Sequence, residues 1–162
     1  MILKIGTGYD IHALKDGKNL VFGGVEIPCN KSFVAHSDGD VLIHAIIDAI
    51  LGALALGDIG KFFPDTDQEF KNIKSTILLE KIVQILKEKN FKVSNLDSNI
   101  ILQKPKLSPF ILDIRKNLAK ILEIDLENVS VKAKTNEKMD SVGKELAIEA
   151  NCVVLLEKTE TT

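Results

Sequence analysis

The sequence predicts an α+β fold, with one mixed β-sheet and helices packed on one of its faces. Strand-like and helix-like segments follow one another without the strict alternation that a parallel α/β sheet requires. A length of 162 residues, 45% of them hydrophobic, is enough for one well-packed core. No repeat, low-complexity segment or linker divides the chain, so we expect residues 1–162 to form a single domain.

The first elements are expected to be short strands, at residues 1–7, 20–22 and 25–27. Gly23 and Gly24 separate the second strand from the third. A glycine pair favours a tight hairpin because glycine readily adopts the positive φ angles that such turns need.

A long apolar helix is expected next, from about residue 39 to residue 56. Ser37 and Asp40 have the spacing of a capping box, in which two side chains satisfy free backbone N–H groups at the start of a helix. The glycines at positions 57 and 60 end this helix, and residues 63–67 have the composition of a loop.

The remaining elements are expected to be two helices and three strands. Ser108 followed by Pro109 is typical of a helix start, because proline at the first helical position loses no hydrogen bond. The apolar residues of both helices recur at helical spacing and are expected to face the core. We expect helices at 75–89 and from 108 onward, strands at 92–102, 129–134 and 146–156, and inward-facing Ile77, Leu78, Ile82, Ile85, Leu86, Ile111, Ile114, Leu118 and Ile121.

Composition and charge argue against several classes of partner. The chain has 21 Lys and Arg against 23 Asp and Glu, and this balance is unlike that of a nucleic-acid or membrane-surface protein. The most apolar stretch, 41–56, is too short to span a bilayer, and the N-terminus lacks a signal-peptide pattern. We therefore expect a soluble cytoplasmic protein that binds neither nucleic acid nor membrane, with Cys29 and Cys152 as structural residues.

The three histidines all lie between residues 12 and 44, and two of them predict a metal site. Asp10 and His12 alternate along an extended segment, so both side chains point to the same side, and His44 lies on the following helix. One carboxylate and two imidazoles suit Zn²⁺ or a similar divalent ion, with the fourth position open to substrate. An isolated Asp-x-His pair is more often accidental, but two preceding glycines and the third ligand candidate favour the metal site.

Asp40, His44 and Asp48 share one face of the expected helix because they are four residues apart. We expect Asp40 to cap the helix. A carboxylate one turn from a metal-bound imidazole often fixes its tautomer, and an exposed carboxylate simply solubilises the helix; for Asp48 both interpretations are open.

Further acidic and basic groups point to phosphate chemistry. Acidic residues at 38, 58, 65 and 67 lie in expected loops, where they either bind hydroxyl groups or Mg²⁺ or merely form turns. Residues 132–138 combine lysines, a threonine and a glutamate, which suits a phosphate and a bridging metal but also an ordinary strand end. The common nucleotide-binding and nucleophile motifs are absent from the sequence. This inventory favours metal-assisted phosphoryl transfer.

Five motifs in a fixed order carry a family resemblance. They are GTGYDIH at 6–12, AHSDGDV at 35–41, LGDIGKFFPDTD at 56–67, QKPK at 103–106 and TNEK at 135–138. Together with His44 they cover nearly the whole chain, and the sequence resembles the 2-C-methyl-D-erythritol 2,4-cyclodiphosphate synthases.

The resemblance implies a homotrimer whose subunit sheets face the threefold axis, with active sites between neighbouring subunits. It also implies a reaction of the non-mevalonate isoprenoid pathway. The 2-phosphate of 4-diphosphocytidyl-2-C-methyl-D-erythritol 2-phosphate attacks the β-phosphate of the same molecule, and CMP leaves as the cyclic diphosphate forms. Two other functions stay open: a metal-dependent phosphoesterase that activates water, and a non-catalytic trimer that binds nucleotide and metal.

The resemblance also assigns roles by matched position. Asp10, His12 and His44 would hold Zn²⁺, and Glu137 would hold Mg²⁺ or Mn²⁺ between the substrate phosphates. His36 and Thr135 match residues that stabilise the transition state. The expected substrate-binding residues are Ser37, Asp58, Ile59, Gly60, Phe63, Asp65, Asp67, Leu102, Pro105, Lys106, Lys134 and Lys144.

This chain departs from the family pattern near its C-terminus. Asp140 and Ser141 stand where Gly-Phe is expected, and Val142, Gly143 and Lys144 stand where Thr-Gly-Arg is expected. Lysine does not replace arginine in bidentate phosphate binding, because it offers a point charge rather than a planar fork.

Overall fold

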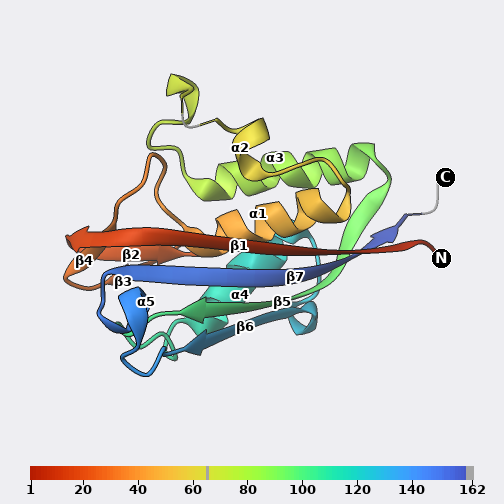
Figure 1. Cartoon of the computed structure of the whole chain (residues 1–162). Helices are drawn as coiled ribbons and strands as arrows, with labels where there is room; N and C mark the ends of the chain where they lie inside the picture. The colour runs from red at the N-terminus through yellow and green to blue at the C-terminus, as the bar shows by residue number, and fades with distance from the viewer. Residues whose placement is uncertain (65, 160–162) are drawn as a thin grey trace.

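A five-stranded mixed sheet forms the centre of the computed structural model, which describes residues 1–64 and 66–159 (Figure 1). Only β5 and β6 are parallel; the other neighbouring strands of this sheet are antiparallel. The observed architecture is therefore α+β with a mixed sheet, as predicted. In spatial order the strands are β4 (Lys31–Phe33), β1 (Leu3–Asp16), β7 (Ala147–Lys158), β5 (Phe91–Ile101) and β6 (Val129–Lys134).

The three long helices lie on one face of this sheet (Figure 1). One buried row of residues runs across the sheet from Gly6 through Val154 and Leu96 to Val129, and these side chains face the helices. The helices are α1 (Val41–Ala53), α3 (Ser75–Glu88) and α4 (Ile111–Leu122), with short turns α2 (Ile59–Phe62), η1 (Gln68–Phe70), η2 (Leu126–Asn128) and α5 (Asp140–Gly143).

Two glycines let α1 approach β1 closely. A Cβ atom added at Gly6 would lie 1.9 Å from the carbonyl oxygen of Ala49, and one added at Gly8 would lie 1.9 Å from that of Ala45. Only glycine avoids these clashes. This contact brings the first turn of α1 against the part of β1 that follows Gly8.

The opposite face of the sheet carries exposed apolar side chains. Ile5 is 69% exposed, and Tyr9, Ile11 and Val153 are also exposed. The register places Thr7, Val153 and Asp97 in one row on this face. Within the described residues no helix is long and apolar enough to cross a membrane.

The predicted hairpin is confirmed. β2 (Asn19–Phe22) pairs with β3 (Val25–Pro28) in a separate two-stranded sheet. Gly23 and Gly24 form the turn with φ angles of 57° and 77°. Both angles lie in the region that side chains disfavour, which explains the glycine pair.

The start of α1 differs from the predicted capping box. The cap is Asp40 itself, whose carboxylate accepts a hydrogen bond from the N–H of Ile43. Ser37 does not cap the helix; its hydroxyl accepts a hydrogen bond from Gly39. The helix covers 41–53 rather than 39–56, because Ala55 takes a φ of 56° that no helix accommodates.

Other boundaries were also predicted incorrectly. The predicted strand 1–7 continues to Asp16 because β7 pairs with it along most of its length, and β4 and α2 were not expected. Residues 108–110 form a turn closed by Phe110 N–H and Leu107 C=O, so Ser108 is not the cap of α4. Ile77 is exposed because the inward face of α3 follows Ser75, Leu78, Leu79 and Ile82.

Candidate active site

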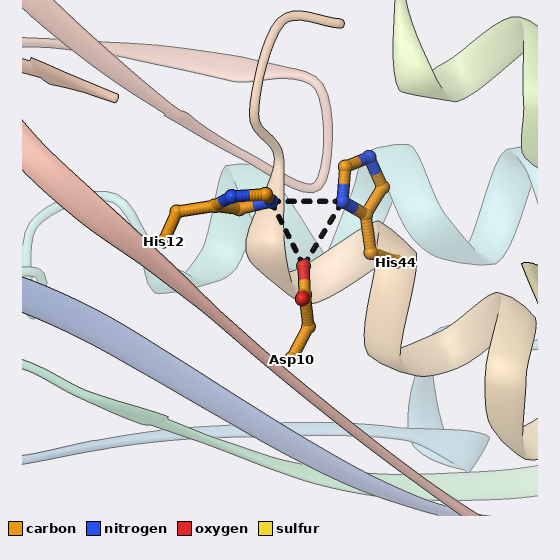
Figure 2. Close-up of side chains that lie close together, drawn as sticks. All are labelled: Asp10, His12 and His44. Atoms are coloured by element: carbon orange, nitrogen blue, oxygen red, sulfur yellow. Dashed lines mark hydrogen bonds and ion pairs between the residues drawn. The ribbon is translucent and has the colours of Figure 1, made fainter. Parts of the chain in front are cut away.

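The metal-binding candidates come from the closely packed part of β1 and α1. Asp10 and His12 alternate on β1 and point to the helix side, and His44 lies in the first turn of α1. Figure 2 shows the three side chains converging on one point. Among the described residues, these three form the group that can hold a metal ion.

The spacing of the three ligand atoms fits a small divalent cation. Asp10 Oδ2 lies 2.9 Å from His12 Nε2 and 3.0 Å from His44 Nδ1, and the two nitrogens are 3.1 Å apart. Ligands at about 2.0–2.1 Å from a tetrahedral metal are separated from one another by about 3.3 Å. The triangle is therefore close to the size such an ion requires, and its donor set suits a divalent metal.

Electrostatics favour a charged carboxylate in this triangle. Burial raises the pKa of Asp10, but hydrogen bonds with His12 and His44 outweigh it and hold the pKa at about 2. For His44, burial lowers the pKa, while the hydrogen bond and charge of Asp10 raise it above the ordinary value. An ionised Asp10 is ready to bind a cation over the physiological pH range.

A cavity of about 310 Å³ opens in front of the triad. His36 and Ser37 line one part of it, and Ile59, Gly60 and Phe63 line another. Further lining comes from Val34, Ala35, Phe70, Ile73 and Leu78, so the cavity has a polar end at the triad and a largely apolar remainder.

Two predicted substrate-binding residues support the walls of this cavity without lining it. Asp58 caps α2 by accepting a hydrogen bond from Lys61 N–H. Asp67 caps η1, and its carbonyl oxygen lies 3.4 Å from Nε2 of His36. Asp65 lies outside the described residues.

A second cavity, of about 500 Å³, lies where β5 and β6 end. Leu102, Pro105, Lys106, Lys134 and Thr135 all line it. Both cavities are formed by described residues, but their sets of lining residues have no member in common.

Glu137 and Lys144 lie outside both cavities. Glu137 is exposed, and its carboxylate accepts a hydrogen bond of 2.7 Å from the Thr135 hydroxyl at the edge of the second cavity. Lys144 is exposed at the C-terminal cap of α5. One chain therefore brings together the predicted ligands Asp10, His12 and His44, but it does not place Glu137 among them.

The structure adds supporting residues that sequence reasoning did not assign. Asp48 accepts a hydrogen bond of 2.7 Å from Ile59 N–H, which ties α1 to the turn that lines the first cavity. The open question about Asp48 is answered by this bond: its carboxylate supports a cavity wall, and no hydrogen bond joins it to the triad. Ser75 hydrogen-bonds to His44 from 31 residues away, and no local sequence signal connects the two.

Comparison with known proteins gives one consistent family. A family model described as the YgbB family matches residues 3–157. The 2-C-methyl-D-erythritol 2,4-cyclodiphosphate synthase of Fusobacterium nucleatum is 59% identical, with 97% of this chain and 98% of the relative covered. The protein of the same name from Brachyspira hyodysenteriae is 56% identical, with 98% of this chain and 100% of the relative covered.

Solved structures that resemble this chain lead to the same family. The bifunctional IspDF from Campylobacter jejuni has a TM-score of 0.94 at 38% identity, with 98% of this chain and 43% of that longer chain covered. The IspF of Plasmodium falciparum, solved as a CDP complex, has a TM-score of 0.86 at 40% identity, with 98% and 97% covered. The likeness extends over nearly the whole of this chain.

Proposed function

The chain belongs to the YgbB family, the 2-C-methyl-D-erythritol 2,4-cyclodiphosphate synthases, and we propose how its two cavities carry out the family's reaction. It is a phosphorus–oxygen lyase of isoprenoid biosynthesis. It converts 4-diphosphocytidyl-2-C-methyl-D-erythritol 2-phosphate into the 2,4-cyclodiphosphate and CMP. The observation that carries this conclusion is 59% identity to a synthase over 97% of the chain, together with an intact Asp-His-His triad.

The triad binds the metal at the reacting end of the first cavity. Asp10, His12 and His44 would hold a divalent ion, and Zn²⁺ is one that this donor set suits. When bound, such an ion polarises the β-phosphate as a Lewis acid. Asp10 adds a negative charge that the protein holds without a proton, which stabilises the cation.

The first cavity positions the methylerythritol 2-phosphate part of the substrate. His36 and Ser37 lie beside the triad and are placed to hold the attacking 2-phosphate near the β-phosphate. Ile59, Gly60 and Phe63 surround the carbon skeleton and limit the entry of water. An oriented internal nucleophile and a largely apolar wall favour ring closure over hydrolysis.

The second cavity accommodates the cytidine part. Its walls at Leu102, Pro105 and Lys106 come from the segment after β5, and CDP-bound relatives support a nucleotide ligand. Thr135 lies between this cavity and Glu137, whose exposed carboxylate would hold Mg²⁺ or Mn²⁺ between the substrate phosphates. Lys134 supplies positive charge at this end, and we propose a phosphate contact also for Lys144, which lies outside the cavity.

We also propose a homotrimer in which the uncovered sheet face forms the subunit contact. Exposed Ile5, Tyr9, Ile11 and Val153 form an apolar surface of the kind that marks a protein interface. The substrate has two ends, and the two cavities of one chain share no lining residue. A neighbouring subunit that places its second cavity next to the first would complete the site.

The test is ³¹P NMR of the purified protein with Zn²⁺, Mg²⁺ and the cytidylyl substrate. We expect CMP and the cyclic diphosphate to appear in equal amounts. CMP with a linear product would instead identify a phosphoesterase, because water would then be the nucleophile. No turnover despite nucleotide binding would indicate a non-catalytic trimer and would contradict the proposal.

A further inference from the structure

Behind His44, on the side away from the triad, lies a buried chain of hydrogen bonds. Figure 2 shows the second ring nitrogen of His44 pointing away from Asp10 and His12. That nitrogen, Nε2, is 2.9 Å from the hydroxyl oxygen of Ser75. The same oxygen is 2.5 Å from Oδ1 of Asp38. Ser75 is 0% exposed, so water does not compete for these contacts.

The direction of each hydrogen bond follows from Asp38. Its Oδ1 accepts from the backbone N–H of Asp40 at 3.1 Å, and its Oδ2 accepts from that of Ser75 at 2.9 Å. Both carboxylate oxygens therefore act as acceptors. The Ser75 hydroxyl in turn donates to Oδ1 of Asp38.

The orientation of Ser75 suits a His44 ring that binds metal through Nδ1. With its only hydroxyl proton on the Asp38 side, Ser75 offers a lone pair to Nε2 of His44. A metal-bound imidazole with its proton on Nε2 donates to that lone pair. Nδ1 is the atom that lies 3.0 Å from Asp10 and 3.1 Å from Nε2 of His12.

We propose that Ser75 is a positioning residue of the metal centre. Together with Asp38 it accepts from Nε2 and holds the His44 ring so that Nδ1 faces the metal site. This inference rests on the metal-binding role proposed for the triad. Buried partners of this kind orient a ligating histidine and raise its affinity for metal.

A second hydroxyl lies near Nε2 but does not replace Ser75. Ser37 Oγ is 3.3 Å from Nε2 and already accepts a hydrogen bond from Gly39 N–H. It has no hydrogen bond to Asp38, so its own proton is not directed away from the ring. Removing the Ser75 hydroxyl therefore leaves Nε2 of His44 with one longer contact, to Ser37.

The test compares Ser75→Ala with Ser98→Ala in the full chain. Ser98 is a matched control because it is also 0% exposed and donates one hydrogen bond, to Ser130 C=O at 2.9 Å, within the sheet. We expect Ser75→Ala to weaken Zn²⁺ binding, measured by competition with a chelator, by roughly 10–100-fold. Ser98→Ala should keep the Zn²⁺ affinity of the parent protein. Equal affinities in Ser75→Ala and the parent would overturn the inference.

A spectroscopic readout separates positioning from a purely structural role. ¹⁵N NMR of the histidine rings in the Zn²⁺-bound full chain should show His44 bound through Nδ1 and protonated on Nε2. In Ser75→Ala the Nε2–H signal should shift and its proton should exchange faster with water, because its buried acceptor is gone, while Ser98→Ala should match the parent. An unchanged His44 signal in Ser75→Ala would contradict the inference. Failure of the parent itself to bind Zn²⁺ would instead contradict the proposed function, because the inference concerns only the difference between Ser75→Ala and a parent that binds the metal.

Discussion

Asp10 shows how one residue combines stability with ligand chemistry. Its carboxylate accepts from two imidazoles, and despite the opposing effect of burial its pKa falls to about 2 from an ordinary value of 3.8. The folded state therefore binds the Asp10 proton more weakly than the unfolded state does. The resulting stabilisation is fully present above about pH 4 and is lost as the pH falls toward 2.

The lowered pKa of Asp10 leads to a pH-dependent prediction for the metal-free protein. The difference in unfolding free energy between the parent and Asp10→Asn should shrink by about 2 kcal/mol from pH 5 to pH 2, as measured by urea denaturation. Asp16→Asn is the control, because the side chain of Asp16 is 97% exposed and should show no such change. A constant difference across this range would show that Asp10 has no depressed pKa.

His44 is predicted to be required for the metal but not for the fold. His44→Ala should lower Zn²⁺ affinity by more than about 100-fold, because losing a direct ligand costs more than losing a supporting partner. Activity should be lost, and the circular dichroism spectrum should stay unchanged. His36 lies in the same cavity but outside the triad. His36→Ala should therefore lower the turnover rate while leaving Zn²⁺ bound. Full activity of His44→Ala without bound Zn²⁺ would refute this role.

At the scale of elements, one carboxylate joins the hairpin to α1. Asp40 is fully buried and accepts hydrogen bonds from Gly23 N–H at 3.0 Å, Gly24 N–H at 2.7 Å and Ile43 N–H at 3.0 Å. The first two N–H groups belong to the turn between β2 and β3, and the third belongs to the first turn of α1. Asp40 thus fixes the end of α1 that carries His44.

Asp40→Ala should therefore destabilise the protein strongly. It removes a helix cap and leaves two backbone N–H groups of the hairpin without their acceptor, for a loss of about 3–5 kcal/mol in unfolding free energy. Denaturant titration measures this loss, with exposed Asp16→Ala as the control that should change little. A loss below about 1 kcal/mol would mean that water or another group replaces the carboxylate.

At the scale of the whole molecule, the sheet has one covered and one uncovered face. The covered face packs on the helices through a continuous core, whereas the uncovered face exposes aliphatic side chains on β1 and β7. Ile5 and Leu155 are directly opposite each other on this face. Exposed apolar side chains gathered on one face mark a surface that another protein covers.

Ile5→Asp should therefore dissociate the proposed trimer. A charge at this position would be buried without a partner in the assembly. Sedimentation velocity should show monomers, and activity should fall with assembly because the site needs a neighbouring subunit. Leu112→Asp is the matched control, since Leu112 is a 48% exposed aliphatic residue on α4, away from this face. If Ile5→Asp stays trimeric, another surface makes the contact.

Local patterns in the sequence were sufficient for several features of this protein. The Gly23–Gly24 hairpin, the strand at 129–134 and the alternation of Asp10 and His12 were all predicted, because turn chemistry and side-chain period are properties of neighbouring residues. The triad could also be proposed, since DxH and one helical histidine are visible in the chain.

Only the tertiary structure decided the features that depend on distant partners. The existence of β4 and the length of β1 follow from pairing with other strands. The order of the five strands follows from the packing of the whole sheet. The contacts of Ser75 with His44 and of Asp48 with Ile59 join different elements, so no local pattern encodes them. The sequence by itself determined which groups can bind a metal. The fold decided which atom of His44 meets it, because only packing places Ser75 and Asp38 behind the ring.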